Sequence, residues 1–169
     1  METDCLIRPP QPQDAEALGR MHNTAWREAY AHFIPERFYD AKAEADRISM
    51  WKEALSQPRR GTLRIALHHN QIIGFANYGP GKDDDAPRSH QLYGLYTLAA
   101  HHGTGLAHQL MAHVLGPQPS YLEVFKDNPR AVRFYSKYGF ALHDELPMSR
   151  WNPRDQDIAH ISALRLTRD

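Results

Sequence analysis

One segment constrains the fold more than any other: a strand that is apolar on both faces and runs straight into a glycine-containing turn and a helix. Gln91–Leu98 is nearly apolar along its whole length, which is typical of a central strand covered on both sides. The following helix carries Leu106, Leu110 and Val114 at i, i+4 and i+8. The segment therefore predicts a layered α/β fold.

Helical periodicity precedes this segment. Apolar residues recur on one face from Asp14 to about Phe33, and Asp14 is suited to be the N-cap. A second amphipathic stretch runs from Pro35 to Ser56 and ends before Pro58. Two consecutive helices are therefore predicted.

Elsewhere the apolar residues alternate with a period of two. The remaining predicted strands are Leu6–Arg8, Thr62–His69, Ile72–Tyr78, Tyr121–Phe125, Phe140–Leu146 and Ile158–Thr167. A tight turn at 69–71 makes a hairpin of the second and third of these. The last helix has Asn128 as N-cap, Pro129 at N1 and Gly139 as its C′ glycine. This order predicts an α/β (α+β) fold with a mixed sheet.

Length and charge limit the class of protein. The chain has 169 residues, which fits a single domain spanning 1–169. Lys+Arg and Asp+Glu both number 20, so a general nucleic-acid binder is not expected. The eleven histidines lack a His-Glu-x-x-His pattern, and the single cysteine, Cys5, excludes a Cys-pair zinc site, so no metal is expected.

The chain is expected to be cytoplasmic. Its first ten residues, METDCLIRPP, are acidic and broken by prolines, unlike a signal peptide. No apolar run of about 18 residues is present, so no membrane association is expected. A lone cysteine fits a reducing compartment.

The turn at 102–105 has the chemistry of an anion site. A helix N-terminus presents free N–H groups and a partial positive charge. Gly103 and Gly105 let the backbone approach an anion such as pyrophosphate, Thr104 adds a hydroxyl, and Ala107 keeps the first helical turn thin. The pattern is neither a P-loop nor the dinucleotide fingerprint, and a glycine turn alone is often only a turn.

The run LYTLAAHHGTGLAHQLM resembles the coenzyme-A pyrophosphate motif of the GNAT superfamily of N-acetyltransferases. His102 takes the motif's Gln/Arg position, and it carries full positive charge only below a pKa near 6.5. Gly105 takes the inner glycine and Ala107 the last position. The resemblance implies a set of cofactor-binding residues: Tyr96, Thr97, Leu98, His102, Gly103, Thr104, Gly105, Leu106 and Ala107.

A second run, LEVFKDNPRAVRFYSKYGF, resembles the family's next motif at the family's spacing. It implies that Tyr135 lies near the coenzyme sulfur as the catalytic acid, and that Asn128 contacts the coenzyme arm. The alternatives are a plain N-cap for Asn128 and a core aromatic for Tyr135.

The N-terminal third, IRPPQPQDAEALGRMHNTAWREAYAHFIP, resembles the family's opening, which forms much of the acceptor wall. Trp26, Tyr30 and Phe33, together with His32, are therefore candidate substrate-binding residues, and plain helix packing is the alternative. His90 joins this candidate set at the start of the central strand.

The resemblance implies an acetyl-CoA-dependent N-acetyltransferase with a mostly antiparallel central sheet of about seven strands and about four helices. The acceptor would be a primary amine of a small molecule (polyamine, aminoglycoside or amino-acid-like) or of a protein or peptide, attacking directly in a ternary complex. Dimers are common in the family, so a homodimer is a further possibility. The alternatives are a non-catalytic acyl-CoA-binding module and a nucleotide-phosphate binder that shares the turn.

The general base stays open at this stage. The family often has Glu where this chain has Gln91, which cannot take a proton. His90, Glu28, His22 and a water relay are the candidates. The family's oxyanion donors correspond to backbone N–H groups at about Thr97–Leu98, where the strand must separate from its neighbour.

Overall fold

The computed structural model describes residues 4–169 and divides into two compact units. The first unit comprises the described residues through Tyr78 together with Gly94–Leu115. The second comprises Gly79–Tyr93 and Gly116–Asp169. The central strand β4 (His90–Thr97) contributes to both units.

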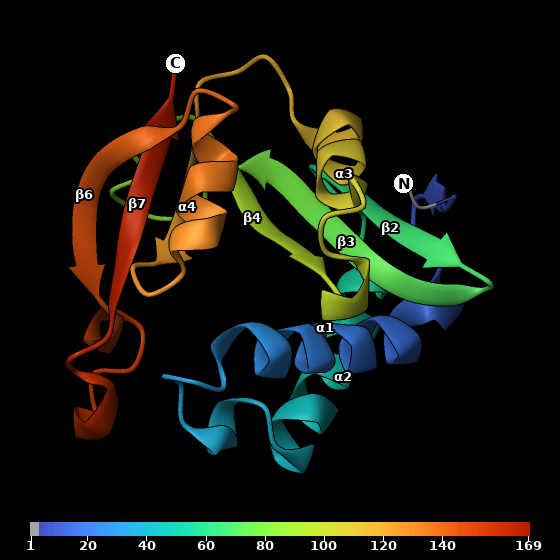
Figure 1. The fold of residues 1–169 in the computed structure, drawn as a ribbon, viewed down its shortest axis with the longest axis horizontal. Coiled ribbons are helices and arrows are strands. Elements are labelled where there is room, and N and C mark those ends of the chain that lie inside the picture. The colour runs from blue at the N-terminus through green and yellow to red at the C-terminus, as the bar shows by residue number, and fades with distance from the viewer. Residues whose placement is uncertain (1–3) are drawn as a thin grey trace. The chain divides into compact units, whose positions relative to one another are not determined.

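The elements follow the predicted order (Figure 1). The α-helices are α1 (Ala15–Tyr30), α2 (Ala41–Ser56), α3 (Leu106–Val114) and α4 (Pro129–Ser136). The other strands are β1 (Leu6–Arg8), β2 (Thr62–His68), β3 (Gln71–Pro80), β5 (Ser120–Phe125), β6 (Ala141–Pro147) and β7 (Ser162–Arg168). The hydrogen-bonded order is β1-β2-β3-β4-β5-β7-β6, which confirms the mixed, mostly antiparallel sheet of seven strands.

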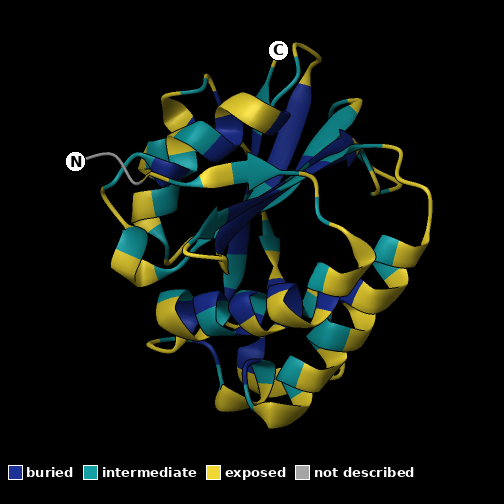
Figure 2. Ribbon diagram, turned by 90° about the vertical axis from the view of Figure 1, so that its right-hand side faces the viewer, coloured by how far each residue is buried: buried dark blue, intermediate teal, exposed yellow. Residues whose placement is uncertain are grey.

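The core of the first unit lies between α1, α2 and the first strands. Leu18, Met21 and Ala25 form the buried stripe of α1, as the helical periodicity predicts. They pack with Trp51 of α2 and with apolar residues of β2 and β3. Trp51 is the only buried residue of α2. In Figure 2 the outer sides of the helices are exposed (yellow), whereas the strands are mainly buried (dark blue) or intermediate (teal).

Gly19 explains how closely the two helices approach each other. A Cβ atom at this position would lie 2.7 Å from Ile48 of α2, on both its backbone and its side chain. Real Cβ atoms do not approach that closely, so a glycine is required there despite its cost inside a helix.

In the second unit the sheet alternation sorts the side chains of β5 into two faces. Glu123 lies opposite Arg165 in the register with β7, and both point to one face. The neighbouring residues of β5 point to the other face, which also carries Arg168 of β7. Phe140, directly after α4, lies under the Arg168 guanidinium at 5.6 Å and contacts Tyr135 of α4 at 6.2 Å between ring centroids. Glu123 and Tyr135 are therefore on opposite faces of these strands.

Several predicted element boundaries were wrong. Helix α2 begins at Ala41, because the Asp40 side chain caps it by accepting the Ala43 N–H, and residues 36–38 form a separate 3₁₀ turn. Asp14 is the N-cap residue of α1, as predicted, but its side chain makes no capping hydrogen bond, because the carboxylate pairs with Arg8 and accepts the Gln11 N–H. Strand β7 begins at Ser162, because residues 156–158 form another 3₁₀ turn.

The predicted hairpin turn and the predicted C′ glycine of α4 each lie one or two residues from the positions found in the structure. The hairpin turn consists of His69 and Asn70, both at positive φ, and Gln71 already belongs to β3. Helix α4 ends at Ser136, so Gly139, with φ of 83°, lies two residues beyond the C-cap Lys137. Its left-handed backbone still explains why glycine is there.

Candidate functional site

The turn between β4 and α3 has the backbone of an anion site. Gly103 and Gly105 adopt φ of 77° and 82°, and Gly105 is the N-cap of α3. A Cβ atom at either glycine would meet nothing within 4 Å, so the space above the turn is open. Within residues 4–169, the N–H groups of 103–107 have no hydrogen-bond partner. The turn therefore offers a row of free donors at a helix N-terminus.

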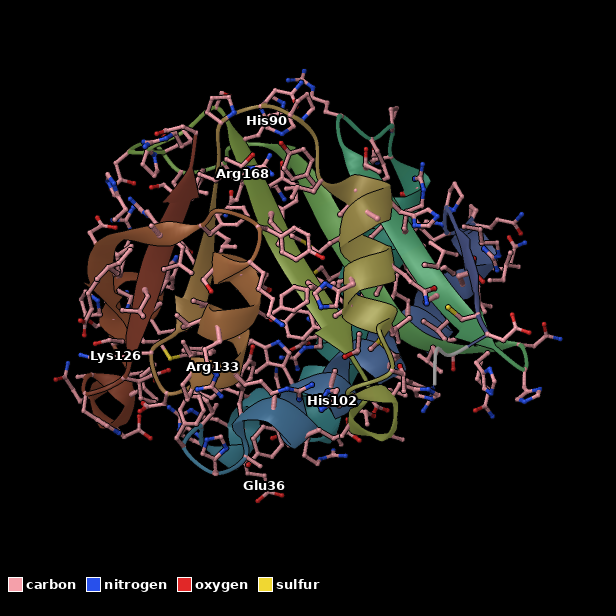
Figure 3. The ribbon with its side chains drawn as sticks, turned by 45° about the horizontal axis from the view of Figure 1, so that its top comes forward. Glu36, His90, His102, Lys126, Arg133 and Arg168 are labelled. Atoms are coloured by element: carbon pink, nitrogen blue, oxygen red, sulfur yellow. The ribbon has the colours of Figure 1, made fainter. Side chains whose placement is uncertain are left out.

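Two side chains of this turn are engaged by its own backbone. The Thr104 hydroxyl donates to the carbonyl of His101 at 2.7 Å, so its proton is already used. Nε2 of His102, labelled in Figure 3, lies 3.2 Å from the carbonyl of Thr97. Anion binding at this turn therefore depends first on backbone N–H groups.

The two backbone N–H groups expected to act as oxyanion donors, at the end of β4, differ in their availability. The Leu98 N–H donates to the carbonyl of Ile73 at 2.9 Å, so it is not available to a reacting group. By strand alternation, the Thr97 N–H points to the opposite edge of β4. On that edge the pairing of β4 with β5 covers only His90–Leu92, so the ladder has ended before Thr97.

Aromatic side chains from α1 cluster with β3 and β4 inside the first unit. Tyr96 lies 5.0 Å from His22 and 6.5 Å from Tyr30 between ring centroids. Trp26 contacts Tyr30 at 4.9 Å and is covered by the guanidinium of Arg47 at 4.6 Å. These candidate acceptor residues thus contribute to packing, and burial raises the pKa of Tyr96 despite hydrogen bonds with Tyr30 and Trp26.

Phe33 and His32 continue this aromatic region past the end of α1. Phe33 lies 5.8 Å from Tyr30 and 4.6 Å from His32 between ring centroids, with edge-to-face geometry in both pairs. Phe33 is half-buried, whereas His32 is exposed.

His22 is unsuited to act as the base. Burial, reinforced by the nearby charge of Arg47, lowers its pKa to about 3. Its Nδ1 accepts a hydrogen bond from the Trp51 indole N–H at 3.1 Å, as a neutral imidazole can. A group with this pKa holds a proton too weakly to drive deprotonation of an amine.

Glu28 has a different task in this structure. Its carboxylate accepts the backbone N–H of Ala99 at 2.7 Å, just after β4. The contact fixes the carboxylate on the chain that leads into the glycine turn.

Helix α4 presents the second predicted pair of residues. The Asn128 side chain accepts the Ala131 N–H at 3.3 Å, so its N-cap role is confirmed. Tyr135 is the one buried residue of α4, with 8% exposure, and its ring contacts Phe134 and Phe140. Its packing is thus that of a core aromatic, and its hydroxyl role stays a prediction.

Glu123 is a functional candidate that the sequence did not single out. It is the only charged residue of β5, its side chain is 19% exposed, and it lies 3.5 Å from the Arg165 guanidinium. Burial raises its pKa to about 7, with a further contribution from the charge of Asp83. A carboxyl group with this pKa can accept and release a proton near neutral pH.

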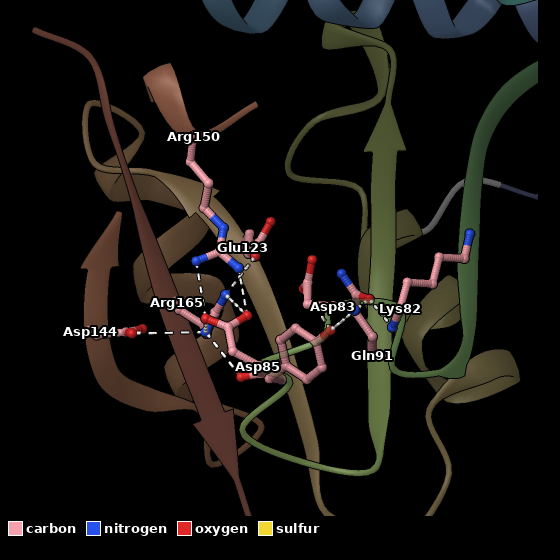
Figure 4. A network of polar contacts seen from close by, with 9 residues as sticks. Lys82, Asp83, Asp85, Gln91, Glu123, Asp144, Arg150 and Arg165 are labelled. Atoms are coloured by element: carbon pink, nitrogen blue, oxygen red, sulfur yellow. Dashed lines mark hydrogen bonds and ion pairs between the residues drawn. The ribbon is translucent and has the colours of Figure 1, made fainter. Parts of the chain in front are cut away.

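Gln91 and His90 lie at the start of β4, where they pair with the first two residues of β5. The Gln91 side-chain oxygen accepts a hydrogen bond from the Lys82 N–H at 3.2 Å and lies 2.9 Å from the Tyr121 hydroxyl oxygen (Figure 4). Nδ1 of His90 lies 3.0 Å from the Ser89 hydroxyl. Gln91 therefore acts as a structural acceptor.

Two kinds of feature are absent from residues 4–169. No group of three or more His, Cys, Asp or Glu side chains in this range could hold a metal ion. Within the same range, no helix combines the length and apolar character that crossing a bilayer requires.

Comparisons with known proteins agree with the fold. The acetyltransferase (GNAT) family model matches residues 20–140. An uncharacterized N-acetyltransferase of Mycobacterium tuberculosis is 38% identical over 112 residues, covering 63% of this chain and 67% of that protein.

Two solved structures share the fold. An N-acetyltransferase from Staphylococcus aureus superposes with a TM-score of 0.71 at 16% identity, covering 99% of both chains. PaiA N-acetyltransferase from Thermoplasma acidophilum, in complex with coenzyme A, superposes with a TM-score of 0.68 at 17% identity, covering 96% of this chain and 98% of that one.

Proposed function

Because this chain belongs to the GNAT family of acetyltransferases and takes acetyl-coenzyme A as its cosubstrate, we propose that it acetylates a primary amine by direct attack in a ternary complex. The acceptor is an amine of a small molecule, such as a polyamine, an aminoglycoside or an amino-acid-like compound, or of a protein or peptide. The observation that carries the proposal is the row of unpartnered N–H groups, within residues 4–169, at the start of α3.

The turn is proposed to hold the coenzyme diphosphate. The N–H groups from Gly103 to Ala107 would donate to the phosphate oxygens, and the α3 dipole would favour the negative charge. The open space above both glycines supports close approach of a ligand. Tyr96, Thr97, Leu98, His102 and Asn128 are the further proposed coenzyme contacts.

Tyr135 is proposed as the acid. When the amine nitrogen attacks the thioester carbon, the carbon–sulfur bond breaks and the sulfur leaves as a thiolate. A thiol titrates near 8.5 and a tyrosine hydroxyl near 10, so the phenol can protonate the thiolate as it forms. The Thr97 N–H is proposed to stabilise the oxyanion on the carbonyl oxygen.

Glu123 is proposed as the base that accepts the amine proton. An alkyl ammonium titrates near 10.4, so the amine must lose a proton before it attacks. Among the groups considered, Glu123 has a pKa of about 7 and His22 one of about 3, which favours Glu123.

The acceptor is proposed to contact Trp26, Tyr30, Phe33 and His90. The aromatic cluster around Tyr96 offers apolar walls with polar tips, which suits the carbon chain of an amine.

The deciding experiment combines calorimetry with an amine panel. Acetyl-coenzyme A should bind the purified protein, and free thiol should accumulate with at least one polyamine, aminoglycoside, amino acid or peptide. Binding without thiol release on any amine would instead indicate a non-catalytic acyl-CoA-binding module. Competition by ATP rather than by coenzyme A would indicate a nucleotide-phosphate site.

A further inference from the structure

A fully buried arginine of the second unit is shared among three carboxylates. Arg165 is 2% exposed and lies 3.3 Å from Asp85, 3.5 Å from Glu123 and 3.8 Å from Asp144 (Figure 4). A buried guanidinium needs such partners, because a buried charge with no partner is strongly destabilising. The carboxylate that receives the most and the shortest contacts from the Arg165 guanidinium is the one whose ionised form Arg165 stabilises most.

Two of the three partners are fixed by the sheet, and the third is not. Glu123 and Asp144 are the cross-strand neighbours of Arg165 on β5 and β6, so register places them. Asp85 comes from the segment between β3 and β4, outside any strand. Its position is instead set by Arg150, whose fork contacts both Asp85 oxygens at 2.5 and 3.0 Å.

Asp85 takes the larger share of the buried guanidinium. Both Nη atoms of Arg165 contact its carboxylate, at 3.3 and 3.4 Å, and Nη1 also lies 3.5 Å from its backbone carbonyl. Glu123 receives a single contact of 3.5 Å from Nη2. These ion pairs hold the pKa of Asp85 far below its usual range, so Asp85 stays ionised and keeps both guanidiniums.

The other charged groups around Glu123 either raise its pKa further, as Asp83 does, or lower it by less than burial raises it, as Arg150 does. Asp83 faces it from the same segment as Asp85 and is held by the Tyr121 hydroxyl, which donates to its carboxylate at 2.7 Å. Arg150 acts on Glu123 through its charge alone and favours the ionised form, as Arg165 does. Burial, with help from the Asp83 charge, raises the pKa of Tyr121 to about 12, so its hydroxyl stays a donor.

We propose that Asp85 is a positioning residue: it draws Arg165 and Arg150 toward itself and so leaves Glu123 able to accept a proton from the amine. The inference rests on the proposed role of Glu123 as base. Without Asp85, both cations would act on Glu123 unopposed and the carboxylate would stay ionised at lower pH, making it a weaker base. The segment that carries Asp85 would thereby control catalysis without touching the reacting atoms.

The test uses the full-length chain and its Asp85→Asn variant. The titration of Glu123 is followed by carbon NMR of labelled glutamate carboxyls and assigned by the resonance lost in Glu123→Gln. Asp85→Asn should lower the Glu123 midpoint by about one pH unit, since a cation a few ångströms away typically lowers a carboxyl pKa by about 1–3 units. Arg150→Gln should move it in the opposite direction, and Asp85→Glu should restore it.

Asp84→Asn is the matched control. Asp84 is exposed in the same segment and has no hydrogen bond or ion pair within residues 4–169, so the midpoint should stay unchanged. An equal shift in Asp84→Asn, or no shift in Asp85→Asn, overturns the inference.

The pH profile of kcat/KM separates this inference from the proposed function. If the pH at which kcat/KM falls on the acid side follows the NMR midpoint of Glu123 in every variant, both the inference and the proposed function stand. If the midpoint moves as expected and that pH does not, control of Glu123 by Asp85 stands and the base assignment falls.

Discussion

The carboxylate of Glu28 accepts the backbone N–H of Ala99 at 2.7 Å, which ties helix α1 to the chain just after β4. Ala99 begins the 3₁₀ turn 99–101, and the glycine turn follows it directly. An ionised acceptor makes a stronger hydrogen bond than a neutral one. The helix proposed to line the acceptor side and the turn proposed to bind the coenzyme are thus joined by one contact.

Glu28→Ala should weaken coenzyme binding. Loss of this hydrogen bond releases the chain before the turn, at a cost of about 1 kcal/mol, or about five-fold in affinity. Glu28→Gln keeps an acceptor and should lose less. Calorimetry with coenzyme A measures both, with the exposed Glu53→Ala on α2 as charge-matched control. Equal affinity in wild type and Glu28→Ala would contradict the coupling.

Gly105→Ala and Gly139→Ala should separate backbone strain from coenzyme binding. Both glycines have φ close to 82°, so an alanine at either should cost about 1–2 kcal/mol of stability. Only Gly105 belongs to the proposed phosphate turn, so only Gly105→Ala should also lose coenzyme affinity. Thermal unfolding and calorimetry check the two effects. Equal affinity loss in both variants would attribute the effect to stability alone.

Tyr135→Phe should lower kcat by about 100-fold and leave coenzyme affinity nearly unchanged. Removing a general acid typically costs 10²–10⁴-fold, whereas the ring that packs on Phe140 remains. Tyr138→Phe, three residues along the same segment, is the control and should keep its activity. Thiol release at saturating acetyl-coenzyme A measures the effect, and unchanged turnover in Tyr135→Phe would remove the hydroxyl from the mechanism.

The features predicted well from the sequence are those set by local chemistry. Alternation located the strands, and the positive φ of Gly103 and Gly105 agrees with the turn expected there. The Asn128 cap and Pro129 at N1 mark the start of α4 as predicted. Each of these depends on a few neighbouring residues, so the sequence contains the information.

The features missed depend on contacts between distant residues. Asp14 is the N-cap residue of α1, but its side chain makes no capping hydrogen bond, because its carboxylate pairs with Arg8. Glu123 was not singled out from the sequence, because its raised pKa depends on burial and on Asp83, 40 positions earlier. A charged residue inside the otherwise apolar run YLEVF was the one signal that could have indicated it.

Stability should fall as the pH is lowered from about 6.5 toward 3 because of His22. Its pKa in the folded protein is about 3, below the ordinary 6.5, so the unfolded chain binds more protons in that window. His22→Gln should flatten this part of the curve. Urea unfolding at a series of pH values measures it, with the exposed His113→Gln as control. An identical slope in wild type and His22→Gln would show that His22 does not contribute.

Glu123 should affect stability with the opposite sign. Its pKa is about 7 in the folded protein and 4.5 ordinarily, so the folded chain binds more protons between these values. Its contribution is therefore fully present below about pH 4.5 and is lost as the pH rises through 7. Glu123→Gln should abolish this dependence, whereas Glu145→Gln, on the exposed edge strand β6, should retain it.

As Glu123 ionises with rising pH, kcat/KM should rise while the stability of the fold falls. The base acts only when ionised, so kcat/KM should rise with pH through about 7 in wild type, where the stability that falls from about pH 4.5 upward has already been largely lost. Glu123→Gln should lose both the rise and most of the rate, while folding more stably near neutral pH. A variant that kept the wild-type pH–rate limb would show that the limb belongs to the acceptor amine or to another group. If Glu123→Gln is more stable and slower than wild type at pH 7, Glu123 is a carboxyl that is buried for its chemistry at the expense of the stability of the fold.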